Sequence, residues 1–195
     1  MLAAFAAMLA WSAWHPKDYF IWILEVFPAL AGIAIVAATY TRFRLSDLAY
    51  LAIVLHSMVL MVGGHYTYAE VPLFDGLRHA LDLTRNNFDR FGHFAQGFFP
   101  AIVAREILLR RSPLRPGKWL FFIVACICLA ISACYEFVEW WTALATGTAA
   151  DAFLATQGDP WDTQWDMLTA LIGAVVSLSL LSRIHDRSMA RLRPR

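Results

Sequence analysis

Apolar stretches of membrane-spanning length recur along the chain, and they leave few folds open to it. Five of them are long enough, or nearly so, to cross a hydrocarbon core of roughly 30 Å at about 1.5 Å per residue. The stretch at the start of the chain covers only about 21 Å by the same rise. In order, the six stretches are residues 1–14, 19–40, 45–64, 91–109, 119–142 and 165–181. They predict one all-α integral membrane domain over residues 1–195, a polytopic helical bundle with about six transmembrane helices.

The first stretch has a competing interpretation as a signal peptide. A signal peptide carries a positively charged region ahead of its apolar core. Residues 1–14 contain no lysine or arginine. We therefore expect a thin or tilted membrane span, or one that is trimmed at its N-terminal end.

The composition excludes several other classes of protein. Of the 195 residues, 59% are hydrophobic and only 16% are charged, with a net charge of +1. Such sparse, balanced charge excludes a disordered chain, a coiled coil and a binder of nucleic acid. Cys126, Cys128 and Cys134 share one apolar stretch. Residues two apart face different sides of a helix, so we expect small buried side chains rather than a zinc pair or a disulfide.

Basic residues alternate between the connections and predict the orientation of the bundle. Residues 39–47, 105–118 and 183–195 hold 2, 5 and 5 of the 16 lysine and arginine residues. The remaining basic residues are Lys17, Arg78, Arg85 and Arg90. Because cytoplasmic loops carry the excess of lysine and arginine, both termini are predicted to be cytoplasmic.

Two long connections are predicted on the outer side. Residues 65–90 include Leu73, Leu77, Ala80 and Leu81 at helical spacing, with charged residues between them. This pattern is typical of a short amphipathic helix at the membrane interface. Residues 143–159 are small and polar, which predicts a loop.

Polar side chains gather at the outer ends of the stretches. Asp89, His93 and Gln96 follow one another at i, i+4 and i+7 and share one helix face. Glu136 and Glu139, at i and i+3, also share a face inside an apolar stretch. Because polar groups at membrane depth are expensive, groups retained there mark a functional site.

The sixth stretch adds two aspartates at i and i+4, Asp162 and Asp166. Asp159 precedes Pro160, a pair typical of a helix N-cap followed by proline at the first helical position. We therefore expect Asp159 to cap this helix. Acidic residues in a first turn also suit the helix dipole, so Asp162 has both a structural and a functional interpretation.

The topology brings these carboxylates to one depth together with His65 and His93. Carboxylates this dense cannot all ionise in a low dielectric unless cations offset them, and Arg90 supplies only one positive charge. A divalent metal is the simplest further source, and imidazole with carboxylate suits Zn²⁺, Mn²⁺ or Fe²⁺. The predicted metal ligands are Asp89, His93, Glu136, Glu139, Asp166 and His65, with Glu136 and Glu139 also catalytic. The predicted substrate contacts are Tyr66, Tyr68, Arg90, Gln96, Asp162 and Trp165.

Several of these residues have an alternative structural interpretation. Asp89 is also placed to cap its helix or to pair with Arg90, and His65 to sit at the membrane interface. The tyrosines and tryptophans are typical interface anchors. Glu25 and His56 are buried polar residues that we expect apart from the cluster, in paired or neutral packing roles.

Four runs in the chain resemble the YjdF-type bacterial inner-membrane proteins. They are HYTYAEVP at 65–72, NNFDRFGHFAQG at 86–97, EFVEWW at 136–141 and GDPWDTQWDM at 158–167. The resemblance covers almost the whole chain and implies a multi-pass protein of the bacterial inner membrane, surrounded by membrane lipid. That family is uncharacterised, so the resemblance supplies no catalytic residue.

Three functions are compatible with these residues, and the first is favoured. It is a metal-dependent hydrolase or transferase acting on a lipid or lipid-linked substrate at the outer face, with a spare carboxylate as general base. The second is a cation or proton transporter, which needs a polar path to the cytoplasmic side. Few polar residues lie in the inner halves of the spans, and Ser132, His56 and Glu106 form a poor path. The third is a non-enzymatic binding role, but the four outer basic residues do not balance the outer acids.

Overall fold

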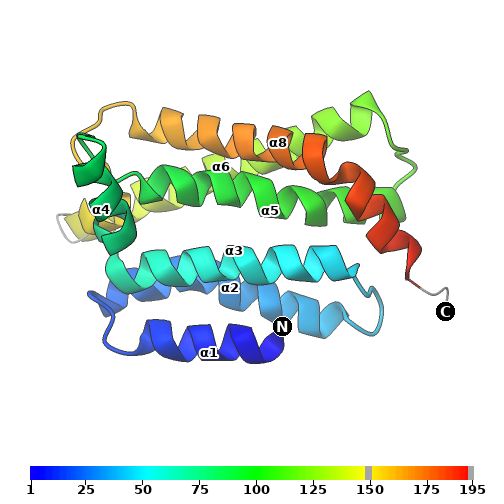
Figure 1. Cartoon of the computed structure of the whole chain (residues 1–195), viewed down its shortest axis with the longest axis horizontal. Coiled ribbons are helices and arrows are strands. Elements are labelled where there is room, and N and C mark those ends of the chain that lie inside the picture. The colour runs from blue at the N-terminus through cyan, green and yellow to red at the C-terminus, as the bar shows by residue number, and fades with distance from the viewer. Residues whose placement is uncertain (148–150, 193–195) are drawn as a thin grey trace.

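The computed structural model describes residues 1–147 and 151–192, and their regular secondary structure is helical throughout. The long helices run up and down side by side; the short α1 begins near the middle of the bundle, and α8 ends at one end of it (Figure 1). We call the other end, where α4 lies across the ends of the long helices, the α4 end. The elements are α1 (Leu2–Ala13), α2 (Tyr19–Thr39), α3 (Asp47–Tyr66), the 3-10 helix η1 (Tyr68–Glu70), α4 (Pro72–Ala80), α5 (Phe88–Arg111), α6 (Lys118–Thr146), α7 (Asp151–Leu154) and α8 (Asp162–Ala190).

Four of the long helices are long and apolar enough to cross a membrane, namely α2, α3, α6 and α8. α1 is apolar but has only 12 residues. α5 has 24 residues, but six of them are charged. The all-α membrane bundle is therefore confirmed, whereas the number of six spans stays a prediction.

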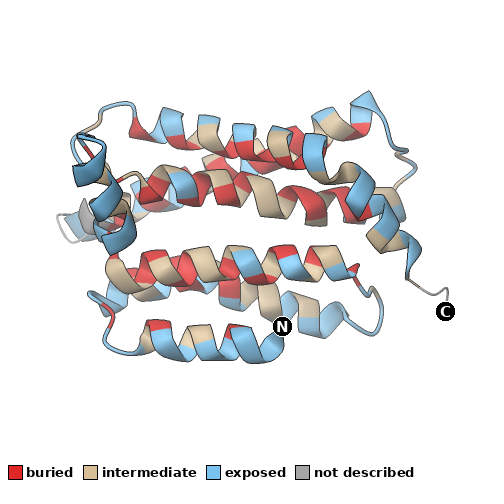
Figure 2. Cartoon of the chain, in the orientation of Figure 1, coloured by how far each residue is buried: buried red, intermediate tan, exposed pale blue. Residues whose placement is uncertain are grey.

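The central helix is α5, which packs against α3, α6 and α8. Buried residues line the facing sides of the long helices, and exposed residues cover α4 and the outer faces (Figure 2). A Cβ on Gly97 would lie 1.8 Å from the carbonyl oxygen of Ala170, and one on Gly173 would lie 2.1 Å from that of Phe94. Small residues thus let α5 and α8 meet at backbone distance, as in other membrane helix pairs. This contact sets the position of α5 against α8.

The predicted cap of the last helix is wrong. The N-cap residue of α8 is Trp161, and the helix begins at Asp162. Asp159 lies in the preceding turn, where its Oδ1 accepts the backbone N–H of Trp161 at 2.9 Å. Its Oδ2 pairs with Arg90 at 2.6 Å, so the carboxylate stabilises a turn and an ion pair instead of the helix start.

The amphipathic helix predicted in the first outer connection is present as α4. It has no buried residue, and Leu73 and Leu77 are exposed. On its polar side Arg78 donates to Asp75 at 2.9 Å. An apolar side left uncovered at the end of a bundle is typical of a helix in the membrane interface.

The second outer connection, predicted as a loop over residues 143–159, is partly helical. α6 continues to Thr146, and α7 follows after residues 148–150, which lie outside the described part of the chain. Phe153 of α7 is buried, with its ring 6.4 Å from that of Tyr135. The loop prediction fails here because a short helix with one apolar anchor has no period long enough to recognise.

Candidate functional site

Five buried side chains from three helices meet at the α4 end. α5 contributes Asp89 and His93, α6 contributes Glu136 and Glu139, and α8 contributes Asp166. Ligand atoms of Asp89, His93 and Asp166 lie within 4.8 Å of one another, and so do those of His93, Glu136 and Glu139. The structure therefore brings together the five residues whose helical spacing predicted a common site, as two triads that share His93.

The imidazole of His93 is oriented as a metal ligand would be. Its Nδ1 donates to the side-chain carbonyl of Gln96 at 3.0 Å. Its Nε2 lies 3.7 Å from Asp89 Oδ1 and 3.6 Å from Glu136 Oε1. Metal-bound histidines commonly fix their tautomer by donating the other ring N–H to an oxygen. Gln96, predicted as a substrate contact, thus positions His93.

Three carboxylates of the site have buried oxygens that lack a hydrogen-bond partner within the described chain: Glu136 Oε1, Asp166 Oδ1 and Asp162 Oδ2. Buried polar atoms are nearly always paired, and an unpaired one calls for a bound water or ion. Anionic oxygens that surround an imidazole lone pair repel it as well as one another. A cation among them would remove both penalties.

Arg85 lies in the candidate site, although the sequence did not predict it there. Its guanidinium is buried, donates to Asp162, and lies 3.4 Å from Asp89 Oδ2 and 3.6 Å from Asp159 Oδ2. Burial alone would lower the pKa of Arg85, but the hydrogen bond and the attraction of Asp162 and Asp89 raise it above its ordinary value. Arg85 is one of only four basic residues on the predicted outer side. That scarcity, beside so many acidic residues, is the feature of the sequence that could have indicated its ion pair.

The basic residues at this end are committed to the outer aspartates. Arg90 pairs with Asp159 and lies over the ring of Trp165, with its Cζ 5.2 Å from the ring centroid. Arg90 and Trp165 thus form the rim of the site, and Asp162 belongs to the Arg85 ion pair. No described arginine or lysine forms an ion pair with Glu136, Glu139 or Asp166, and His93 lies 3.6 Å from Glu136 Oε1.

Two loops close over the site through side-chain amides. Gln157 Oε1 accepts the backbone N–H of Asn86 at 2.9 Å, and Gln157 Nε2 donates to the carbonyl of Asn86 at 2.8 Å. The Asn86 amide in turn donates to the carbonyl of Val71 at 3.1 Å. These contacts hold Arg85 in place, since it directly precedes Asn86.

A chamber of about 120 Å³ lies beside the triads. Its lining shows that the predicted positions of two residues were wrong. Glu25 of α2 and His56 of α3, which we expected apart from the cluster, both line it together with Asp89, His93 and Glu139. The Tyr135 hydroxyl donates to Glu25 at 3.1 Å, whereas His56 Nε2 is buried without a partner in the described chain.

Tyr68, a predicted substrate contact, also lines this chamber. Its ring occupies space that two glycines leave free. A Cβ on Gly63 would lie 2.0 Å from the ring, and one on Gly92 would lie 2.7 Å from it. Because these glycines of α3 and α5 have no side chain, the Tyr68 ring fits between the helices and lines the chamber.

A second cavity of about 400 Å³ opens the site toward the surface between α6 and α8. Glu136 and Glu139 line it, together with Thr163 and the exposed side chains of Phe137 and Trp140. Asp89, His93 and Asp166 do not. The two glutamates thus lie between the buried triad and an apolar entrance on the side of the bundle.

His65 and Tyr66 are not part of this site, which corrects the sequence prediction. His65 Nδ1 bonds to the backbone oxygen of Ser12 at 3.0 Å, and its ring lies 4.4 Å from that of Trp11. The Tyr66 ring lies edge-on to His65 at 4.6 Å. His65 thus packs toward α1, whereas Tyr66 packs against the apolar cluster of Tyr68, Val71, Phe88 and Ala155.

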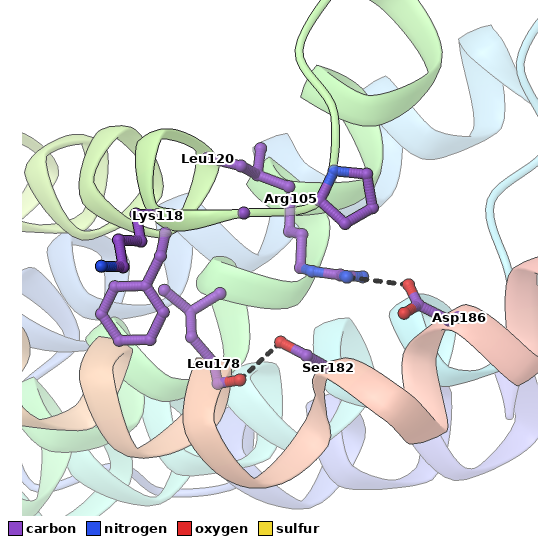
Figure 3. A pocket seen from close by; sticks show the side chains of 9 residues that line it. Arg105, Lys118, Leu120, Leu178, Ser182 and Asp186 are labelled. Carbon is purple, nitrogen blue, oxygen red and sulfur yellow. Dashed lines mark hydrogen bonds and ion pairs between the residues drawn. The ribbon is translucent and has the colours of Figure 1, made fainter.

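The opposite end of the bundle holds a larger cavity of about 460 Å³, with Arg105 donating to Asp186 at 2.7 Å (Figure 3). Beside it, Glu106 accepts hydrogen bonds from the Ser46 backbone N–H at 2.8 Å, from Arg110 at 2.6 Å and from His185 Nε2 at 3.0 Å. The ligand triads lie at the α4 end, so we place the functional site there.

Comparisons with known proteins agree on the class of protein. The family described as "Predicted membrane protein (DUF2238)" matches residues 1–187. The chain is 47% identical to inner membrane protein YjdF of Escherichia coli (strain K12), over 94% of this chain and 88% of that protein. No solved structure matches the chain. The resemblance seen in the sequence is thereby confirmed.

Proposed function

The chain belongs to the DUF2238 family of predicted membrane proteins, and we propose that it is a metal-dependent hydrolase or transferase acting on a lipid or lipid-linked substrate. One observation carries the proposal. Around His93 Nε2, buried carboxylate oxygens from α5, α6 and α8 converge, and oxygens of Glu136 and Asp166 have no partner in the described chain. A divalent cation such as Zn²⁺, Mn²⁺ or Fe²⁺ beside His93 supplies positive charge near both oxygens and a ligand contact for Asp166.

The two triads have different surroundings, which favours different roles. His93 presents one free nitrogen, so it completes one of the triads and not both. Asp89, His93 and Asp166 form the triad without contact to the 400 Å³ cavity. We assign the metal to these three residues. Glu136 and Glu139 face the cavity and are the catalytic carboxylates.

The chemistry follows from this division of roles. A metal held by one histidine and two aspartates, with positions left open, polarises a carbonyl or phosphoryl oxygen and activates a water molecule. Glu139 or Glu136 accepts the proton of that water as general base. The cavity between α6 and α8 opens these glutamates to the side of the bundle, past Phe137 and Trp140. A site open to the side of a membrane bundle suits a substrate that comes from the bilayer.

The membrane arrangement belongs to the same proposal. α1 and α5 join the four apolar helices as spans, with α5 shielded because α3, α6 and α8 surround it. Arg42, Arg110 and Arg115 lie at the end opposite α4, with most other basic residues. By the positive-inside rule that end is cytoplasmic, so the site opens at the periplasmic side of a bacterial inner membrane.

Elemental analysis of the detergent-purified protein tests the metal assignment. We expect a divalent transition metal in stoichiometric amount in the parent and in Glu139→Gln, and its loss in Asp166→Asn. Asp75→Asn, on the exposed α4 helix, is the matched control and should keep the metal. A metal-free parent contradicts the proposal. Loss of metal in Glu139→Gln but not in Asp166→Asn contradicts the assigned roles.

The enzymatic step has its own test. Metal-loaded protein is incubated with an extract of bacterial lipids, and the lipids are compared by mass spectrometry before and after. A lipid consumed by the parent but not by Glu139→Gln, which retains its metal, supports the proposal. If both proteins consume the lipid at an equal rate, Glu139 has no catalytic role.

Cation or proton transport is the second candidate, because Glu25 and the unpartnered His56 extend the polar chamber deeper into the bundle. Flux in liposomes that collapses in His56→Gln while metal content is unchanged would favour it.

A further inference from the structure

An apolar groove continues directly from the polar chamber. The groove, of about 240 Å³, is bounded by α2, α3 and α5. It shares four lining residues with the chamber: Pro28, His56, Leu60 and Pro100. Beyond them its lining includes Gly32, Ile35, Ala52, Ile53, Phe99 and Val103. The two adjoining spaces therefore have ionisable groups at the α4 end and apolar side chains along the rest.

We propose that the groove holds the hydrocarbon chain of a membrane lipid whose polar end lies in the chamber. The inference rests on the proposed function and narrows the substrate to a lipid. The polar head of this lipid lies at the triads, and its hydrocarbon chain runs along α3. Groove and chamber together have the polarity pattern of one amphiphilic ligand. A soluble metabolite would leave the apolar part empty, and a purely apolar ligand would leave the chamber unpaired.

The direction of the groove fits a lipid in a bilayer. Along α3 the floor runs from Leu60 to Ala52, which is about 12 Å at the rise of an α-helix. α3 is one of the candidate membrane spans, so the groove follows the direction in which lipid chains extend. Ile35 on the wall is exposed and opens the groove to the side.

Two helices carry a proline where chamber and groove meet. Pro28 lies within α2 and Pro100 within α5, and each removes one helical hydrogen bond to the residue four positions before it. Glycine at position 32 keeps the groove open, because a Cβ there would meet no atom within 4 Å. A leucine at this position therefore has room at its Cβ and is expected to project into the groove that Gly32 lines.

Photolabelling separates a chain inside the groove from the lipid that surrounds any membrane protein. The protein is placed in nanodiscs of phosphatidylethanolamine and phosphatidylglycerol with a phospholipid that carries a diazirine near the end of one acyl chain. Ala52 is buried, with only 4% of its surface exposed, so annular lipid does not reach it. We expect labelling at Ala52 itself, located by fragmenting the labelled α3 peptide, because its neighbours Leu51 and Leu55 are exposed to annular lipid.

Filling the groove should abolish that labelling selectively. Gly32→Leu is expected to reduce labelling at Ala52 at least several-fold, whereas Ala34→Leu, on the exposed side of the same helix, should leave it unchanged. Equal labelling in both variants, or no labelling at Ala52 in the parent, overturns the inference. Metal content is measured on the same samples. Metal without labelling refutes the groove alone, and labelling without metal refutes the metalloenzyme alone.

Discussion

Replacing Asp166 by asparagine should stabilise the metal-free protein and at the same time abolish its stabilisation by metal. Asparagine keeps the shape of the side chain but removes its charge and weakens it as a ligand. A purely structural aspartate would behave differently, because its loss would lower stability under both conditions. The opposite signs of the two effects make this substitution diagnostic.

The size of the first effect follows from the geometry of the triad. Ligand oxygens of Asp166 and Asp89 lie within 4.8 Å of each other. Two unit charges at that separation repel by about 3 kcal/mol at an effective dielectric constant of about 20. Arg85 and partial protonation offset some of this repulsion. Asp166→Asn should therefore raise the free energy of unfolding of the metal-free protein by about 1–3 kcal/mol.

The second effect follows from mass action. At a free metal concentration of about 100 times Kd, binding to the folded state adds about 2.7 kcal/mol to the free energy of unfolding of the parent. For a chain of this length, that corresponds to a rise in Tm of about 5–10 °C. Asp166→Asn lacks one of the three ligands, so most of this rise should disappear.

Thermal unfolding in detergent measures both effects, with the fluorescence of the 8 tryptophans as the signal. Each protein is melted with a chelator and again with Zn²⁺ or Mn²⁺. Asp75→Asn serves as the control and should match the parent in both conditions. The reasoning fails if Asp166→Asn melts below the parent in chelator, or if metal raises its Tm as much as that of the parent.

Three further outcomes are expected. Arg85→Gln leaves Asp162 buried without a basic partner and should lower the free energy of unfolding by about 3–5 kcal/mol in the same melting assay; a change below about 1 kcal/mol contradicts the buried ion pair. His65→Phe keeps the aromatic contact with Trp11 and should leave the metal content of the purified protein unchanged, whereas metal loss would return His65 to the ligands. In a variant without native cysteines, Asp75→Cys should react with an impermeant thiol reagent in intact cells and Arg115→Cys should not; the reverse pattern refutes the proposed orientation.

Local periodicity explains why much of the site was predictable. The shared helix faces of Asp89 with His93, and of Glu136 with Glu139, follow from 3.6 residues per turn alone. Alternating loops then place these faces at one end of the bundle. The sequence thus predicts how far along the bundle axis a residue lies. It does not predict the direction in which the side chain points around its helix. His65 has the right depth and faces α1.

Contacts between distant helices and between loops could not be predicted from the sequence. Glu25 joins the chamber because Tyr135 of α6 lies beside α2, and no pattern within either helix specifies that neighbour. Arg85, Asn86 and Gln157 lie in connections without regular period, so their ion pair and amide contacts depend on how the loops fold over the bundle. The same holds for Asp159, whose expected cap was replaced by an ion pair.

Burial of an acid is not by itself a sign of a metal, as the two ends of α5 demonstrate. Glu106 is fully buried, yet both of its oxygens accept hydrogen bonds, from Ser46, Arg110 and His185. Such a carboxylate is stabilised as an anion by its neighbours and needs no ion. At the α4 end of the same helix, Arg85 and Arg90 pair with Asp89, Asp159 and Asp162, and one oxygen each of Glu136 and Asp166 remains unpaired in the described chain. Since both clusters are similarly buried, the difference lies in the supply of donors. That shortfall, rather than the number of carboxylates, is the reason to expect a cation beside His93.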